Sequence, residues 1–410
     1  MTVHTQQIKK GGRLLKSSLK EKMELPFVVK SARAKTILTI FMIVVMLTFA
    51  VRGLTKPWAY GYFNYTLNWF HGFIPRGFVG TIGRLLFGNL YYSQTFLSLL
   101  QYALAWLFIF YLCYMVYQLI YANGNLIAAL VMFVFFTSTF CMFYLSEIGF
   151  FDHILYLLVA IYIEISLRQK VKTCLIFGGI LSALCPLILD TGAFVACPII
   201  ASIAAIRVIS ERSKIVLHDC RNICFVFIPT IIMIAIYKLL QPNLQAVEIF
   251  LKQSQARSYY STDFDYYGAF FKMKNLGNTT PHSWVYIPPQ VVIYGALLIG
   301  LTTLFLYIIR ANTTVILTYA VCAFASGFVG YAAIYFGSDY HRYYFATVMS
   351  IFIISLYVLR TYASSFVKWK HGVVAIIITV FIITNIMGYR LWHWNQVYWN
   401  FWFKILFKSK

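Results

Sequence analysis

The sequence predicts an all-α integral membrane protein, a polytopic helix bundle with about 11 transmembrane helices and a cytoplasmic N-terminus. Hydrophobic residues make up 61% of the 410 residues and charged residues 11%, a balance that soluble globular domains do not have. The apolar residues are gathered in eleven stretches, and several reach the roughly 20 residues that a spanning helix needs. Basic residues fill the short turns between alternate stretches, which is typical of a chain that crosses a membrane repeatedly.

No stretch alternates apolar and polar residues as a strand would, and an open sheet is unstable in lipid. We therefore expect each apolar stretch to form a helix. In chain order the predicted spans cover residues 36–52, 92–121, 126–145, 154–167, 173–189, 192–209, 222–240, 290–310, 313–336, 345–360 and 372–389.

The positive charges predict the orientation of the bundle. If the N-terminal tail is cytoplasmic and the chain is threaded back and forth, 20 of the 34 Lys and Arg residues fall inside and 14 outside. Short loops rich in Lys and Arg stay on the cytoplasmic side of a membrane. The expected cytoplasmic cations lie in the tail, around Arg168, around Arg207, at Arg310 and after Arg360.

Between and around the spans, four further segments are expected. Residues 1–35 form a basic cytoplasmic tail ahead of the transmembrane bundle at 36–389, and the first span is interpreted as a signal anchor with no cleavage site. Residues 53–91 form an amphipathic or re-entrant outer element, and residues 241–289 form a long outer loop. Residues 390–410, rich in Trp and Lys, are expected to lie as a helix in the headgroup region.

Several function classes are disfavoured by composition and motifs. The net charge of +22 is concentrated in the tail and at span ends, so it indicates topology and attraction to anionic lipid, and no nucleic-acid partner is expected. No P-loop, GxGxxG, HExxH or GxSxG motif is present, and the eight cysteines lack metal-ligand spacing. We expect neither a metal nor another cofactor.

Ionisable residues at the mouths of the spans are the candidates for function. Such groups are costly at membrane depth, at least about 2.5–3.5 kcal/mol each, and they are usually paired or functional. They would line a shared outer vestibule, or else serve as hydrophilic caps of short turns. The vestibule candidates are Arg76, Asp152, Asp190, Asp339, His341 and Arg342. Glu164, near the cytoplasmic end of its span, is expected to pair with Arg168 at i,i+4.

The long outer loop mixes charged side chains with aromatic rings, a composition that suits carbohydrate or a solvated loop. Rings stack on sugar faces, and arginines form bidentate contacts with pyrophosphate. The loop candidates are Arg257, Tyr259, Tyr260, Asp263, Asp265 and Trp284.

The architecture resembles that of bacterial O-antigen and capsular polysaccharide polymerases, with many spans, one large outer loop in the second half and arginines in the outer loops. These enzymes join sugar repeats carried on undecaprenyl pyrophosphate, and the family associates catalysis with outer-loop Arg-x10-Gly segments. The stretch from Arg257 to Gly268 has that spacing. The resemblance implies polymerisation of lipid-linked repeats at the outer face of the bacterial inner membrane.

A second resemblance is to multi-span polyprenyl-phosphate-sugar glycosyltransferases of the phage serotype-converting type. Those enzymes usually carry an acidic residue in the first outer loop, whereas residues 53–91 contain no Asp or Glu. Asp152, in the next outer turn, would have to take that role. A lipid-linked glycan transporter or flippase and a non-catalytic membrane partner are the remaining hypotheses.

The polymerase hypothesis assigns roles to the outer residues. Asp152 or Asp339 would act as the base for the acceptor hydroxyl, with His341 as a further candidate. Arg257, Arg342 and Arg76 would stabilise the departing lipid pyrophosphate. The predicted glycan-binding residues are Asp190, Tyr259, Tyr260, Asp263, Asp265 and Trp284. The expected partners are the undecaprenyl-linked glycan, membrane lipids and other polysaccharide-assembly membrane proteins.

Overall fold

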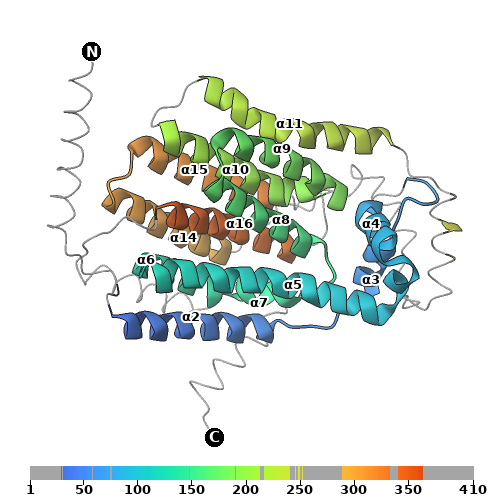
Figure 1. Ribbon diagram of the computed structural model, residues 1–410, viewed down its shortest axis with the longest axis horizontal. Helices are drawn as coiled ribbons and strands as arrows, with labels where there is room; N and C mark the ends of the chain where they lie inside the picture. The colour runs from blue at the N-terminus through green and yellow to red at the C-terminus, as the bar shows by residue number, and fades with distance from the viewer. Residues whose placement is uncertain are drawn as a thin grey trace, which may run out of the picture.

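The computed structural model confirms the all-α class. It describes residues 29, 31–57, 59–73, 76–146, 148–189, 191–212, 217–240, 245, 248–249, 252, 289–332 and 340–362. Helices lie side by side along one direction (Figure 1), and these described residues contain no strand beyond an isolated bridge between Ile148 and Phe150. The predicted tail up to residue 28, the span at 372–389, the segment 390–410 and most of the loop 241–289 lie outside the described residues.

The helices follow one another in a simple order. The first half contains α2 (Ala32–Arg52), α3 (Ala59–Thr66), α4 (Gly77–Phe87), the 3-10 helix η1 (Gly88–Tyr92), α5 (Gln94–Val116), the π-helical turn η2 (Tyr117–Ala122), α6 (Leu126–Phe136) and α7 (Thr139–Ser146). The second half contains α8 (Asp152–Arg168), α9 (Val171–Ile188), α10 (Gly192–Arg212), α11 (Leu217–Leu239), α14 (Pro289–Ile308), α15 (Thr313–Ala332) and α16 (Tyr340–Thr361).

Among the described residues, seven helices are long and apolar enough to cross a membrane, and the total is eight if the bent pair α6 and α7 counts as one span. The pair bends by 60° between Phe136 and Thr139. Helix α8 has 17 residues, at the lower limit of the roughly 17–25 that a span needs. In α11 the described apolar stretch is Arg221–Ile236. The protein is thus a polytopic membrane protein, while the predicted number of eleven spans is not confirmed.

Successive helices run back and forth, so the turns gather at two ends (Figure 1). At one end Lys35 Nζ contacts the Ala122 carbonyl, Arg207 donates to the Gln169 carbonyl at 3.2 Å, and the Tyr362 hydroxyl donates to Ser210. We call this the basic end; the sequence predicts it to be cytoplasmic. The opposite end, with the start of α8 and of α16, is called the outer end.

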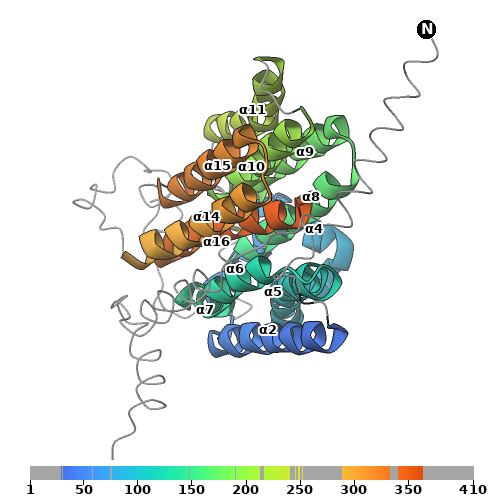
Figure 2. The same cartoon turned by 90° about the vertical axis from the view of Figure 1, so that its left-hand side faces the viewer.

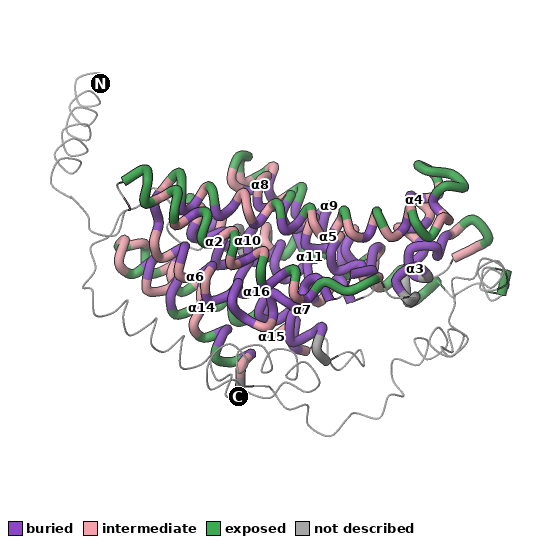
Figure 3. The backbone as a smooth tube through the Cα atoms, turned by 90° about the horizontal axis from the view of Figure 1, so that it is seen from below, coloured by how far each residue is buried: buried purple, intermediate pink, exposed green. Residues whose placement is uncertain are grey.

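Helix α16 lies at the centre of the bundle. Figure 2 shows it surrounded by α6, α8, α14 and α15. In its most apolar stretch of 18 residues 89% of the residues are buried, against 28% in the corresponding stretch of α2. The difference is visible as the purple centre and the green margins of Figure 3. Apolar side chains exposed on the helices at the margin of the bundle cost no free energy in lipid.

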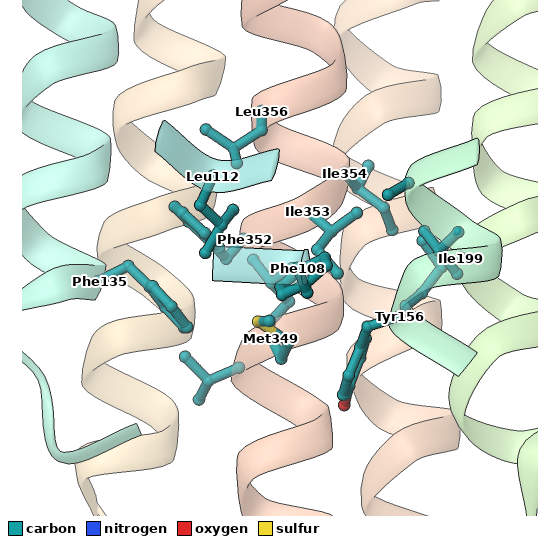
Figure 4. Packing of buried hydrophobic residues seen from close by; sticks show 14 of the residues in the cluster. Phe108, Leu112, Phe135, Tyr156, Ile199, Met349, Phe352, Ile353, Ile354 and Leu356 are labelled. Carbon is teal, nitrogen blue, oxygen red and sulfur yellow. The ribbon is translucent and has the colours of Figure 1, made fainter. Parts of the chain in front are cut away.

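Close packing and interhelical hydrogen bonds hold the centre together, as expected where lipid supplies no hydrophobic driving force between helices. The rings of Phe352 on α16 and Phe135 on α6 stack with centroids 3.9 Å apart (Figure 4). The hydroxyls of Ser166 and Tyr357 lie 2.9 Å apart and join α8 to α16. These contacts fix α8 beside α16, which positions the site described below.

The segment predicted as an outer amphipathic or re-entrant element contains α3, α4 and η1. Buried glycines line one face of α4, where a Cβ at Gly80 would collide with the Leu67 carbonyl and one at Gly83 with the Tyr91 ring. The other face exposes Leu85 and Leu86 at 68% and 71%. Helix α4 is therefore amphipathic: it packs tightly on the protein and presents apolar side chains to its surroundings.

Candidate functional site

Two residues singled out in the sequence meet at the outer end. Arg342 Nε lies 2.5 Å from Asp152 Oδ2, and the two side chains are only 9% and 8% exposed. Asp152 begins α8 and Arg342 lies in the first turn of α16, so the ion pair joins two helices that are far apart in the sequence. Because each charge alone would be costly at this depth, the two side chains depend on one another.

A tight glycine contact sets the position of Asp152. Gly149, in the turn between α7 and α8, has φ +107°, a conformation that side-chain-bearing residues rarely adopt. A Cβ at Gly61 on α3 would lie 2.8 Å from the Gly149 Cα, so the outer element packs backbone to backbone on this turn. This contact fixes the turn that leads into Asp152 against α3.

Aromatic rings surround the pair. The Arg342 guanidinium lies 4.9 Å from the centre of the Phe150 ring, a cation–π distance. The Phe151 ring packs on Tyr65 of α3 with centroids 4.8 Å apart, and Phe345, one turn after Arg342, packs on Tyr156. The charged groups thus lie in a poorly hydrated setting, where their electrostatic effects on a bound group are strengthened.

His153, the neighbour of Asp152, has a positioning role. Its Nε2 lies 2.9 Å from the Tyr144 carbonyl and its Nδ1 lies 3.2 Å from the Phe150 carbonyl, and its ring packs edge-on against Tyr144. With the proton on Nε2 the ring donates to the Tyr144 carbonyl and ties the start of α8 to α7, whereas with the proton on Nδ1 it donates to the Phe150 carbonyl in the preceding turn.

Tyr65 lies within the electrostatic influence of the site. Burial raises the pKa of the Tyr65 phenol well above its ordinary value, and electrostatic interactions with Tyr91 and Asp152 raise it further. The phenol therefore stays neutral at physiological pH and keeps its proton.

Arg76, a further predicted vestibule residue, lies on the outer element immediately before α4. It is buried and adopts a left-handed backbone conformation with φ 64°. For a residue with a side chain this conformation costs about 1–2 kcal/mol, which the surrounding contacts must offset. Such strain indicates that the position of Arg76 is tightly determined.

The remaining predicted residues are not placed by the structure. Helix α16 includes the backbone of His341, next to Arg342, while its side chain is not described. Outside the described residues lie Asp190, Arg257, Tyr259, Tyr260, Asp263, Asp265, Trp284 and Asp339.

A second charged cluster lies at the basic end. Arg168 donates to Glu164 at 2.8 Å, which confirms the predicted i,i+4 pair. The sequence analysis missed that Arg360 of α16 also pairs with Glu164 and donates to the Tyr114 hydroxyl at 2.9 Å. Helices α8 and α16 are thus joined by one ion pair near each end.

Comparisons with protein-family models, with curated proteins and with solved structures found no match. In the part of the chain that the structure describes, no three His, Cys, Asp or Glu residues are grouped to hold a metal ion. Among the described residues, the outer ion pair and its surroundings are therefore the candidate functional site.

Proposed function

We propose that this protein assembles surface polysaccharide in a bacterial inner membrane, polymerising oligosaccharide repeats carried on undecaprenyl pyrophosphate at the outer face. The observation that carries the proposal is the buried Asp152–Arg342 pair at the outer end. A carboxylate and a guanidinium in contact supply the two groups that the reaction needs, a proton acceptor and a stabiliser of negative charge.

The proposed step is a glycosyl transfer. The acceptor hydroxyl oxygen forms a bond to the anomeric carbon of the donor repeat, and the bond from that carbon to the pyrophosphate oxygen breaks. The hydroxyl proton passes to the Asp152 carboxylate. The lipid pyrophosphate leaves with the bonding electron pair, and Arg342 stabilises its negative charge.

The surroundings of the pair support a lipid-linked substrate. The apolar face of α4, with Leu85 and Leu86, lies at the outer end, where it would contact the lipid tail of a substrate arriving from the membrane. The Arg84 guanidinium on the same helix lies 4.4 Å from the Phe70 ring centre, which adds a cation and an exposed ring near the proposed entry.

The distribution of polar groups favours this hypothesis over a flippase. Between the two charged clusters, the described buried residues of α8 include Leu155, Val159 and Ile163, and α16 contributes Met349 and Phe352. A flippase needs a polar route that reaches both faces of the membrane. The apolar packing, in which Figure 4 shows Met349 and Phe352, argues against such a route through the centre of the described bundle.

The test is the banding pattern of lipopolysaccharide or capsule from a strain that lacks the gene, complemented with variants. We expect wild type to restore the long ladder, and Asp152→Asn and Arg342→Gln to leave core plus one repeat. The charge-swapped variant Asp152→Arg/Arg342→Asp would regain an ion pair but leave the ladder absent.

The control is the other α8–α16 ion pair. The double variant Glu164→Gln/Arg360→Gln removes charges that join the same two helices at the basic end. It should retain the ladder when its amount in the membrane matches wild type. If both pairs behave alike at equal protein amounts, the outer pair has only a structural role and the proposal is wrong.

The second candidate is a transferase that adds a single sugar from a polyprenyl phosphate carrier. The observation in its favour is that Gly149 and Phe151, close to Asp152 in the sequence, pack on α3 of the outer element, where Asp152 would replace the missing acid of residues 53–91. An intact ladder with altered serology in the deletion strain would select this function over polymerisation.

A further inference from the structure

A groove opens on the side of the bundle between α5 and α8, towards the basic end. Its volume is about 400 Å³. Apolar residues line most of it, and polar residues line one end. The apolar residues are Leu107, Leu157, Ala160, Ile161 and Ile165, and the polar end is formed by Tyr111, Glu164, Arg168 and Gln169.

The groove faces the lipid. Leu107 and Ile161, on its two sides, are each 52% exposed. From Leu157 to Arg168 the helix rises by about 16 Å at 1.5 Å per residue. That length is close to half of the roughly 30 Å hydrocarbon core, so the groove extends over one leaflet with its polar end at the headgroup level.

The polar end carries a net positive charge. The carboxylate of Glu164 is shared by two guanidiniums, those of Arg168 and Arg360, which leaves one positive charge in excess. Lys170, just before α9, and Lys172, in its first turn, follow and are exposed. Anionic lipids are attracted to such basic groups by about 1 kcal/mol for each residue near the surface.

Arg168 is suited to bind a phosphate in particular. Its side chain is 65% exposed, and one nitrogen is held by Glu164 at 2.8 Å. A guanidinium has five N–H donors, so an Arg held by one nitrogen still presents donors to a second anion. Glu164 thereby fixes the direction in which Arg168 points, over the mouth of the groove.

We propose that this groove binds one anionic phospholipid, with an acyl chain along Leu157 and Ile161 and the headgroup phosphodiester against Arg168 and the two lysines. The excess positive charge favours an anionic over a zwitterionic headgroup. The site lies at the opposite end of α8 from Asp152, so the inference is independent of the proposed function.

The test measures lipid binding to the full-length protein in detergent by native mass spectrometry, with phosphatidylglycerol and phosphatidylcholine in parallel. We expect wild type to prefer phosphatidylglycerol. Arg168→Gln should weaken phosphatidylglycerol binding roughly fivefold, which corresponds to about 1 kcal/mol, and leave phosphatidylcholine binding unchanged. Ile161→Trp, which fills the groove with a larger ring, should weaken the binding of both lipids.

The matched control is Arg221→Gln. Arg221 is an exposed cation of α11 at the same basic end, outside the groove. Equal losses for Arg168→Gln and Arg221→Gln would show nonspecific attraction and overturn the proposal. An unchanged lipid preference in Arg168→Gln, or binding of glycerol phosphate as tight as that of phosphatidylglycerol, would overturn it as well. Lys170→Gln/Lys172→Gln gives a second measurement if Arg168→Gln reduces the yield of folded protein.

Discussion

Neutralising one member of the outer ion pair should destabilise the bundle more than any other single charge removal among the described residues. Asp152→Asn leaves the Arg342 guanidinium buried beside a neutral amide. Two unit charges about 4 Å apart attract by about 4 kcal/mol at an effective dielectric constant of about 20. Breaking a buried pair by removing one partner typically costs about 3–5 kcal/mol.

The exposed fractions of 8% and 9% justify the use of that range, because solvent screens the pair little. We expect Asp152→Asn and Arg342→Gln each to lower the free energy of unfolding by about 3 kcal/mol or more. The double variant should lose much less than the sum of the two, since no charge is left uncompensated.

The assay is unfolding of the purified protein in mixed micelles with increasing denaturing detergent, followed by tryptophan fluorescence. A double-mutant cycle isolates the coupling energy between the two side chains. Glu164→Gln serves as comparison and should cost less, because Glu164 is 21% exposed and its two partners, Arg360 and Arg168, are 13% and 65% exposed. Additive effects, with a coupling energy below about 0.5 kcal/mol, would refute the reasoning.

Three further outcomes are expected. Gly80→Ala should loosen the outer element, because the added methyl group meets the Leu67 carbonyl. Limited proteolysis should then cut α4 faster. The control is Gly300→Ala, where the added methyl group meets no atom within 4 Å and cleavage should not change. Phe352→Ala should cost about 3–5 kcal/mol in the detergent unfolding assay, because it leaves a cavity at the centre of the bundle. The raised pKa of Tyr65 means that the folded state disfavours the phenolate. The contribution of Tyr65 to stability is therefore complete below pH 10 and is lost as the pH rises further. Tyr65→Phe should reduce the difference in unfolding midpoint between pH 8 and pH 11, and an unchanged difference would contradict this.

Local patterns in the sequence were sufficient to predict the fold class and to single out individual charged residues. Long apolar stretches require helices, since lipid leaves no other partner for the backbone. The pair of Glu164 with Arg168 follows from helical spacing alone. Asp152 and Arg342 stood out because ionisable groups are costly at the mouth of a span.

The tertiary structure alone decided which of these groups meet. The sequence placed Asp152 and Arg342 at the same membrane face but contained no sign that α8 and α16 bring them into contact. It likewise gave no indication that Arg360 shares Glu164 with Arg168. In a soluble helix the apolar stripe marks the face that packs inward, whereas a helix in lipid is apolar on every side. Helix adjacency in this protein is therefore set by side-chain fit and interhelical hydrogen bonds, which only the folded bundle shows.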